Sequence, residues 1–277
     1  MLYVILKYLM RLTLKSYFKV LKVVGKENIP NKGPIIFVAN HPSTLMDPVV
    51  IGAIVRPQIY FLAAAEFMGK GIVTWLMQWL FNMIPIYRPQ TLPDKSGKNA
   101  DVFEKCYKHL SRNGSILIFP EGSSITEKKL RPLKTGVARI AYGVKERYDT
   151  NVQIVPIGLN YSDPHSFQSE LYVRIGASIS IPKADLSQIE DPFERAKALT
   201  QIIEGKLKEN LIHLEDERLE SLFEKIRWVS NHELRIVNSS KLGLDDKFKL
   251  DQEIQDGLDI AYAEEDIVPS VEDELKD

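Results

Sequence analysis

The stretch Ile35-Ile36-Phe37-Val38-Ala39-Asn40-His41 decides the fold. A short run that is apolar at every position is typical of a strand that helices cover on both faces, as in parallel sheets. Similar runs recur at 59–64, 115–119, 153–159 and 171–175. More than thirty residues with helical periodicity separate the second run from the third and the third from the fourth. This alternation predicts an α/β fold with a largely parallel central sheet flanked by helices.

The bulk composition indicates a globular protein of one large or two small domains. The chain has 277 residues, of which 44% are hydrophobic and 26% charged, and these are ordinary globular values. The single cysteine excludes an intramolecular disulfide and favours a reducing compartment, and no Cys/His cluster has zinc spacing. Cys106 falls on the apolar face of the helical pattern 99–112, so we expect a buried, inert thiol.

The N-terminal residues are basic and the C-terminal residues are acidic. Residues 1–28 carry six cations and one anion, whereas residues 243–277 carry thirteen acids and three bases. The cations at 7, 11, 15 and 19 recur every four residues and form one narrow stripe on an otherwise apolar helix. We expect a helix that lies in a membrane surface with its cations near anionic head groups. The alternative is a helix packed on the domain with a solvated lysine face.

The residues Asn40-His41-Pro42-Ser43-Thr44-Leu45-Met46-Asp47 follow the first apolar strand directly. Ligands of open α/β sheets bind at the carboxyl ends of the strands. A histidine there is a candidate general base, and a nearby carboxylate would orient its imidazole. The alternatives are that His41 is an ordinary loop histidine and that Asp47 is only the N-cap of a helix over 48–55.

Two further segments carry candidate binding residues. Phe119-Pro120-Glu121-Gly122 ends another strand, where Glu121 could accept hydrogen bonds from a polyol and the turn could hold an anion. Downstream, Lys134 precedes a helix start, a position suited to phosphate. Arg88 leaves an extended stretch after apolar residues, and its planar guanidinium could hold a phosphate. The simpler interpretations are a structural turn and a surface arginine.

Four segments, taken in this order, resemble the glycerolipid acyltransferase family. They are the block around His41 and Asp47, the stretch ending at Arg88, the Phe-Pro-Glu-Gly turn, and Val155-Pro156. That family includes glycerol-3-phosphate and 1-acylglycerol-3-phosphate acyltransferases, and the resemblance covers about residues 35–160. It implies that His41 is the catalytic base, paired with Asp47. It also implies that the phosphorylated acceptor is held by four residues: Arg88, Glu121, Gly122 and Lys134.

The resemblance implies an O-acyltransferase of phospholipid synthesis. A fatty acyl group would pass from acyl-CoA or acyl-acyl-carrier protein to a hydroxyl of 1-acylglycerol-3-phosphate or glycerol-3-phosphate, without an acyl-enzyme. We expect no cofactor beyond this thioester co-substrate, no metal and no nucleic-acid partner. The expected location is peripheral, on the cytoplasmic face of a membrane with anionic lipids. The alternative is a non-catalytic membrane lipid-binding protein on a degenerate acyltransferase fold.

The expected organisation has four parts. Residues 1–30 form the amphipathic membrane-surface helix, 31–184 the acyltransferase domain, 185–262 a helical extension, and 263–277 an acidic disordered tail. Within the domain, residues 72–84 are hydrophobic almost all round. They are too short to span a bilayer. They predict a buried core helix or the lining of an acyl-chain channel.

The chain departs from the family pattern at two places. Five residues separate His41 from Asp47, where the usual block has four, and Ser124 stands where the usual turn has an arginine. On one straight helix, residues six apart would point about 240° away from each other. We therefore expect a bend near Pro42 and Pro48 if the pair is to meet. Lys134 or Arg131 is expected to replace the missing arginine.

Overall fold

The computed structural model of the chain describes residues 2–67, 71, 82–88, 97, 99–180, 186, 188–238 and 243–263. They belong to two compact units. Unit 1 comprises Met1–Ile125 and Pro132–Asn210, and unit 2 comprises Thr126–Arg131 and Leu211–Asp277. The short segment 126–131 therefore interrupts unit 1 in the sequence.

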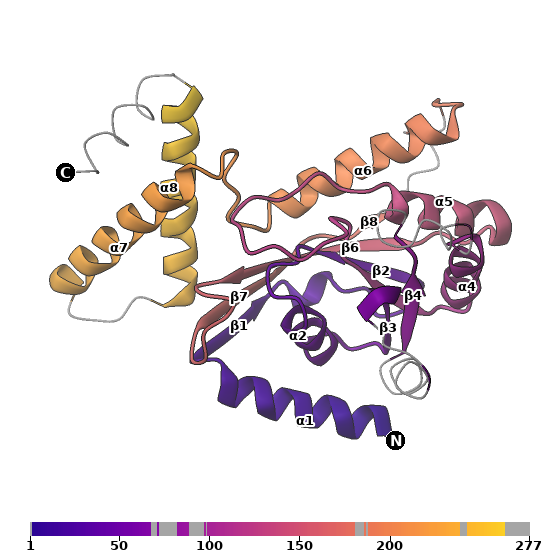
Figure 1. Cartoon of the computed structure of the whole chain (residues 1–277), viewed down its shortest axis with the longest axis horizontal. Helices are drawn as coiled ribbons and strands as arrows, with labels where there is room; N and C mark the ends of the chain where they lie inside the picture. Colours follow the sequence, from indigo (N-terminus) through magenta and orange to yellow (C-terminus); the bar gives the residue numbers. More distant parts are fainter. Residues whose placement is uncertain are drawn as a thin grey trace. The chain divides into compact units, whose positions relative to one another are not determined.

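Unit 1 is built on one sheet with the strand order β1-β7-β6-β2-β5-β3-β4, and β8 pairs with β6 (Figure 1). Neighbouring strands from β6 to β4 are parallel, whereas β7 and β8 run antiparallel to β6. The expected fold class, a largely parallel sheet flanked by helices, is confirmed. The strands are β1 Val20–Val24, β2 Ile35–Ala39, β3 Ile59–Ala64, β4 Met83–Ile86, β5 Ser115–Ile118, β6 Gln153–Tyr161, β7 Glu170–Ile175 and β8 Ile179–Ser180.

The central strand β2 is buried along its whole length. Successive side chains of a strand point to opposite faces of the sheet. Ile35, Phe37 and Ala39 accordingly share one core with residues of α1 and α2. Figure 1 shows α1 and α2 on one face of the sheet and α5 and α6 on the other. The continuous apolar run therefore reflects a strand that is covered on both sides.

The helices of unit 1 cover both faces of the sheet. α4 packs against α5, α5 against α6, and α6 against β6. Because α6 belongs to unit 1, the predicted division at residue 185 differs from the boundary between the units, which follows Asn210. The helices are α1 Leu2–Tyr17, α2 Met46–Ile54, α4 Asn99–Ser111, α5 Gly136–Tyr148 and α6 Pro192–Lys208, with short 3-10 turns at Lys26–Asn28 and Ala65–Phe67. On α4, Cys106 is buried as expected, and burial raises the pKa of its thiol to about 12.

The N-terminal helix is shorter than the predicted range 1–30. It ends at Tyr17, and β1 follows and pairs with β7. Lys19 of the predicted stripe therefore lies beyond the helix, and Lys7 and Arg11 point elsewhere than expected. Lys7 donates to the carbonyl oxygens of Val55 and Arg56, and Arg11 Nε donates to Ala53 O at 2.7 Å. The last carbonyls of a helix have no intrahelical partner and carry the negative end of its dipole, so these cations cap the C-terminus of α2.

The opposite face of α1 is apolar and exposed. Five of its large hydrophobic side chains are between 45% and 67% accessible: Val4, Ile5, Tyr8, Leu9 and Leu12. A contiguous exposed apolar surface of this kind marks an interaction site more often than chance. Among the described residues, no helix has the length and hydropathy needed to cross a membrane.

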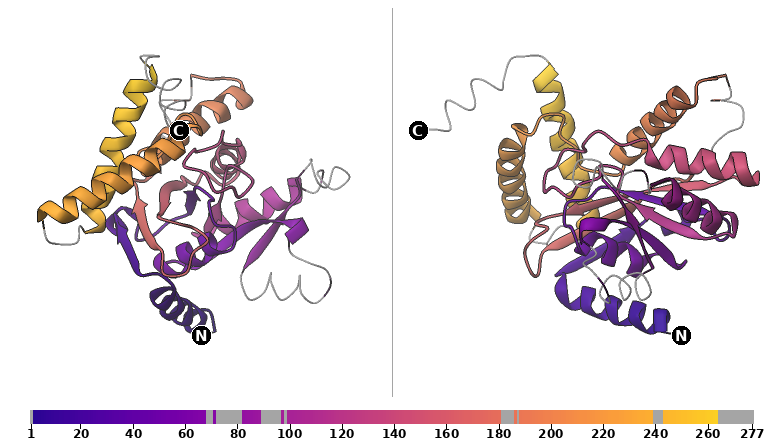
Figure 2. Two further views of the ribbon diagram at one scale, coloured as in Figure 1. Left: turned by 60° about the vertical axis from the view of Figure 1, so that its left-hand side comes forward. Right: turned by 45° about the vertical axis from the view of Figure 1, so that its right-hand side comes forward.

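Unit 2 contains two helices packed against each other, α7 (Leu219–Asn238) and α8 (Leu244–Ala263), which are the orange and yellow helices of Figure 2. Arg227 of α7 and Asp251 of α8 form an ion pair with Nε and Oδ1 3.2 Å apart. Two predictions lie largely outside the described residues: the hydrophobic helix at 72–84 and the disordered tail at 263–277. The end of the first differs from the prediction, because Met83 and Ile84 belong to β4.

Candidate active site

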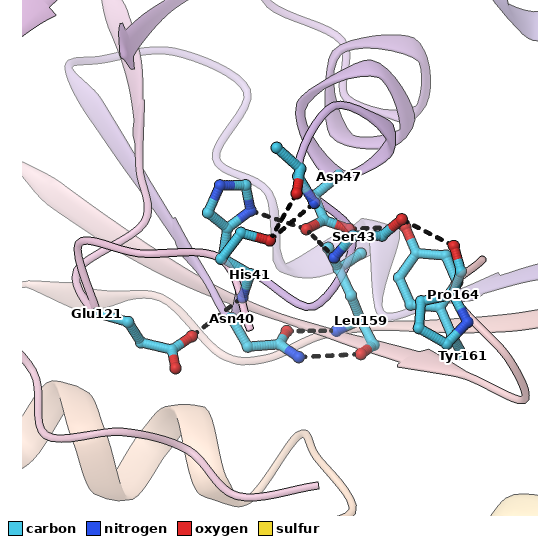
Figure 3. A network of polar contacts seen from close by, with 10 residues as sticks. Asn40, His41, Ser43, Asp47, Glu121, Leu159, Tyr161 and Pro164 are labelled. Atoms are coloured by element: carbon cyan, nitrogen blue, oxygen red, sulfur yellow. Dashed lines mark hydrogen bonds and ion pairs between the residues drawn. The ribbon is translucent and has the colours of Figure 1, made fainter. Parts of the chain in front are cut away.

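His41 and Asp47 meet despite the extra residue between them. Nδ1 of His41 lies 2.8 Å from Oδ2 of Asp47 (Figure 3). The two residues do not share a helix, because His41 follows β2 and α2 begins at Met46. Between them the chain turns, with a hydrogen bond from Met46 N–H to Ser43 O and a positive φ of 27° at Thr44. The expected bend is therefore present, and it lies at Thr44.

Asp47 does not act as the N-cap of α2. The capping position is Leu45, and Asp47 lies inside the first turn. Its carboxylate faces the strand ends and is fully buried. A buried carboxylate is costly unless hydrogen bonds compensate for its lost hydration. Oδ2 accepts from the backbone N–H of Ser43 at 2.8 Å and contacts His41, and Oδ1 accepts from the hydroxyl of Tyr161 at 2.8 Å.

Tyr161 is a site residue that the sequence analysis missed. It is the last residue of β6, the strand beside β2. Burial raises the pKa of its phenol far above the usual value, and the negative charge of Asp47 raises it further. The phenol therefore stays protonated and donates to the carboxylate. The prediction ended this strand at residue 159 and thus left out the position that reaches Asp47.

The His41 imidazole is held in one orientation. Its ring stacks on Phe119 with the centroids 3.9 Å apart and an angle of 10° between the planes. Asp47 Oδ2 already accepts from the Ser43 N–H, so it also serves as the acceptor for Nδ1–H of His41. In this tautomer the lone pair lies on Nε2. The side chain is 16% exposed. Nε2 is therefore the atom able to take a proton from a bound molecule.

Strand register brings the motifs together. Val38 of β2 pairs with Ile118 of β5, so three residues further along each chain His41 comes beside Glu121. The backbone N–H of His41 donates to Glu121 Oε1 at 3.0 Å, and the N–H of Ile125 donates to His41 O at 3.1 Å. On the other side, Asn40 exchanges two hydrogen bonds with the backbone of Leu159, at 2.8 and 3.0 Å.

Gly122 and Lys134 also lie together. Gly122 adopts a left-handed φ of 78°, and a Cβ at this position would collide with the Lys134 side chain. The backbone angle therefore favours glycine here, whereas the exposed Lys134 side chain could shift to make room for a Cβ. The N–H of Lys134 donates to Pro120 O at 2.9 Å, which closes the loop on itself. Lys134 is exposed beside the turn and lies two residues before α5 begins at Gly136.

Arg88 lies apart from this group. It follows β4, which is separated from β2 by β3 and β5, and three strand spacings amount to about 14 Å. Its guanidinium pairs with Glu66, with Nη1 and Oε1 3.4 Å apart. Arg131 forms an ion pair with Glu127, with Nη2 and Oε1 3.1 Å apart, and both residues belong to unit 2. A ligand that contacts both Arg88 and His41 must therefore be extended.

An apolar pocket opens beside the His41–Asp47 turn. Its volume is about 220 Å³, and it lies between α1, α2, β3 and β4. Its lining residues include Leu6 and Met10 of α1, Val49 of α2, Phe61 of β3, and Leu45 of the turn itself. The turn that carries His41 therefore also forms one wall of an apolar cavity.

Comparison with known proteins fits this geometry. The family model described as Acyltransferase matches residues 20–160. The chain belongs to the Acyltransferase family. The match includes β2, β5 and all of β6 except its last residue, and it covers four site positions: His41, Asp47, Glu121 and Gly122. It ends just before Tyr161.

Several relatives of this acyltransferase-family chain are glycerolipid enzymes by name. Over 104 residues it is 39% identical to Glycerol-3-phosphate O-acyltransferase 1 of Saccharomyces cerevisiae, covering 37% of this chain and 14% of the yeast protein. Over 156 residues it is 27% identical to the probable 1-acyl-sn-glycerol-3-phosphate acyltransferase of Mycoplasma pneumoniae, covering 54% of this chain and 53% of that protein. The chain thus spans well under two thirds of the length of these relatives.

The fold also resembles a solved structure, that of the 1-acyl-sn-glycerophosphate acyltransferase from Thermotoga maritima. The TM-score is 0.51 and the sequence identity 20%, over 75% of this chain and 79% of the other. At this identity the likeness concerns the fold alone.

Proposed function

We propose that the chain transfers a fatty acyl group from an acyl thioester, acyl-CoA or acyl-acyl-carrier protein, to a hydroxyl of a phosphorylated glycerol, with His41 as the general base. The observation that carries the proposal is the ordered contact from Tyr161 through Asp47 to Nδ1 of His41. This arrangement fixes the tautomer and supports the positive charge that develops on the ring during proton transfer.

The reaction requires one proton to move twice. Nε2 of His41 takes the proton of the acceptor hydroxyl while its oxygen bonds to the thioester carbonyl carbon. The tetrahedral intermediate then collapses, the carbon–sulfur bond breaks, and the thiolate receives the proton from the imidazolium. No side chain needs to be acylated. General-base catalysis of this kind raises the rate by a factor on the order of 10²–10⁴. Holding both substrates together contributes the remainder of the rate enhancement.

The Glu121–Gly122 turn and Lys134, all of unit 1, form the proposed acceptor site, and the loop between them is called the acceptor loop. Lys134 supplies a cation beside the Gly122 turn, and the Glu121 carboxylate lies against the His41 backbone. Glycerol-3-phosphate is the acceptor that we propose first, because the relative with 39% identity is named as a yeast glycerol-3-phosphate O-acyltransferase. The alternative acceptor, 1-acylglycerol-3-phosphate, is the substrate class in the name of the Mycoplasma relative.

The apolar pocket is the proposed site of the acyl chain. Its lining is almost wholly apolar, and Leu45 links it to the turn between His41 and Asp47. An acyl chain in this pocket would have its thioester end near the proposed base. Burial of methylene groups contributes about 0.8 kcal/mol each, so the pocket supplies binding energy as well as orientation.

The outward face of α1 is the proposed membrane contact. Its exposed apolar side chains, among them Ile5 and Leu9, would enter the head-group region, while the exposed Lys15 and Lys19 reach anionic lipids. Lys7 and Arg11 are engaged at the end of α2, so apolar contact carries more of this binding than charge does. The proposed location is peripheral, at the cytoplasmic face.

The test is an assay of the purified 277-residue chain with palmitoyl-CoA and a panel of acceptors. The panel comprises glycerol-3-phosphate, 1-acylglycerol-3-phosphate and a lysophospholipid without a free phosphate group, and each product is identified by mass spectrometry. We expect transfer to one of the two free phosphate monoesters. Absence of transfer to every acceptor, with lipid binding retained, would favour a non-catalytic lipid-binding protein instead.

A further inference from the structure

The middle of the acceptor loop belongs to unit 2, although both of its ends belong to the site. The connection from Phe119 to Thr135 contains neither helix nor strand. It leaves the site at Ile125, whose N–H bonds to His41 O, and returns at Lys134, whose N–H bonds to Pro120 O. Long loops without secondary structure are uncommon in compact domains and are usually either functional or disordered. Between these two anchors lie residues 126–131.

Both the backbone and the side chain of Lys128 contact other residues of unit 2. Its carbonyl accepts from Leu214 N–H at 2.7 Å, and its own N–H lies 3.4 Å from Glu220 Oε2. Its ammonium lies 2.7 Å from Glu224 Oε1 and 3.7 Å from Glu220 Oε1. The side chain is only 19% exposed and passes over the ring of Phe223, with Nζ 5.7 Å from the centroid.

Leu130 is held by a second set of contacts. Its side chain is 6% exposed, and its N–H donates to His213 Nδ1 at 2.9 Å. Acceptance at Nδ1 requires the lone pair on that nitrogen, so the ring of His213 carries its proton on Nε2. The backbone N–H of His213 in turn donates to Gln255 Oε1 of α8 at 2.8 Å. The segment is thus tied to α7 through Glu220 and Glu224, and to α8 through His213 and Gln255.

We propose that unit 2 is a positioning element for the acceptor loop. By fixing Lys128 and Leu130, its helices hold the middle of the loop, so that Ile125 and Lys134 keep the anchors that shape the Glu121–Gly122 turn. The role of this turn in holding the acceptor rests on the proposed function. Lys128, His213, Glu220 and Glu224 are positioning residues, since they act through the loop and not on a substrate.

The clean test variant is Lys128→Met. It removes the ammonium that Glu220 and Glu224 bind and keeps an unbranched chain over Phe223. The matched control is Tyr262→Phe, which removes the hydrogen bond from the Tyr262 hydroxyl to Asp216 Oδ2 at 2.8 Å. Both changes weaken a polar contact inside unit 2, but only the first touches residues 126–131. His213→Phe is the second variant, because it removes the acceptor for Leu130 N–H.

Hydrogen exchange of the 277-residue chain is the first readout, and it needs no substrate. We expect the amides of Ile125 and Lys134 to exchange at least about 10-fold faster in Lys128→Met than in the wild type, and to be unchanged in Tyr262→Phe. Unchanged exchange at these two amides in both Lys128→Met and His213→Phe overturns the proposal. This result stands whether or not the chain transfers acyl groups.

Steady-state kinetics with palmitoyl-CoA and glycerol-3-phosphate or 1-acylglycerol-3-phosphate is the second readout. A positioning role raises the KM for the acceptor at least about 5-fold in Lys128→Met and leaves the KM for palmitoyl-CoA unchanged. Faster exchange with an unchanged acceptor KM would mean that unit 2 holds the loop but does not position an acceptor, which overturns that part of the inference. An inactive wild type would count against the proposed function, and the exchange result would still decide whether unit 2 fixes the loop.

Discussion

Thr44 and Ser124 meet through the oxygen of the serine side chain. Ser124 Oγ accepts from the Thr44 N–H at 2.9 Å and from the Thr44 hydroxyl at 3.0 Å. Thr44 is the residue with positive φ in the turn between His41 and Asp47. Ser124 stands where the family pattern has an arginine. The two departures from that pattern are therefore in contact, and the serine supports the turn that accommodates the additional residue.

Replacing Ser124 with alanine should lower activity through this turn. The variant loses the acceptor of two hydrogen bonds, each worth about 1 kcal/mol, so we expect kcat/KM to fall roughly 5- to 30-fold. Because Thr44 is exposed, water replaces part of the loss and the melting temperature changes little. Steady-state kinetics and thermal unfolding measure the two effects.

A second substitution separates this role from a direct role of the serine hydroxyl in binding. Glycine adopts a positive φ without strain, so Thr44→Gly introduced into the Ser124→Ala variant should recover part of the lost activity. If the double variant is as impaired as the sum of the two single variants, Ser124 does not act through Thr44.

Replacing Tyr161 with phenylalanine tests the donor behind Asp47. A hydrogen bond to a charged group is worth about 1.5–3 kcal/mol, so we expect kcat to fall about 10- to 100-fold. KM for both substrates should stay within about twofold, because the phenol contacts only the carboxylate in the proposed mechanism. The matched control is Tyr142→Phe. The Tyr142 hydroxyl lies buried on α5 and has no hydrogen-bond partner among the residues that the structure describes. An equal loss in both variants would assign the effect to packing.

The bounds of a strand could be predicted well where the strand is a continuous apolar run. β2 and β3 have the predicted bounds, because each is a continuous apolar run. β1 was not predicted, since Lys19 and Lys22 continue the helical spacing of cations, and only its pairing with β7 makes it a strand. The stretch from Ile84 to Arg88 was predicted to be extended, but the first two residues of β4, Met83 and Ile84, were assigned to the end of a hydrophobic helix. The partner strand β3 is remote in sequence, so its pairing does not appear in a local pattern.

The contact between His41 and Asp47 could be predicted from a motif, whereas its surroundings could not. His41 and Asp47 stand in one short block, so a resemblance located both. Tyr161 has no motif, and it reaches Asp47 only because β6 lies beside β2. The register of β2 and β6 determines the contact between Tyr161 and Asp47. Ala39 pairs with Ile157, and β6 then continues alongside the turn that joins His41 to Asp47. The separation of Arg88 from His41 likewise depends on strand order.

The pocket should set the preferred length of the acyl chain. Leu6 lines it from α1, and Leu6→Trp shortens the cavity. One methylene that no longer fits costs on the order of 1–3 kcal/mol, so kcat/KM for palmitoyl-CoA should fall at least about 10-fold relative to decanoyl-CoA. Leu12→Trp is the control, since Leu12 faces outward on the same helix. An unchanged preference in Leu6→Trp would place the acyl chain elsewhere.

The exposed face of α1 should control vesicle binding. The double variant Ile5→Glu with Leu9→Glu places two charges on that face, and we expect at least about 10-fold weaker binding to vesicles of phosphatidylcholine and phosphatidylglycerol. Phe193→Glu on α6 is the control, as Phe193 is also an exposed large hydrophobic residue. Vesicle co-sedimentation measures both. Equal loss in the control would show that any added charge suffices.

The central claim is that His41 removes the proton of the acceptor. This role is tested by the rate of product formation by His41→Asn, with palmitoyl-CoA and the acceptor that the wild type uses. The control is His232→Asn, because His232 is a solvent-exposed histidine of α7. We expect kcat to fall at least about 10²-fold in His41→Asn, with vesicle binding and melting temperature retained, and we expect wild-type kinetics for His232→Asn. Retention of wild-type kcat in His41→Asn would contradict the central claim.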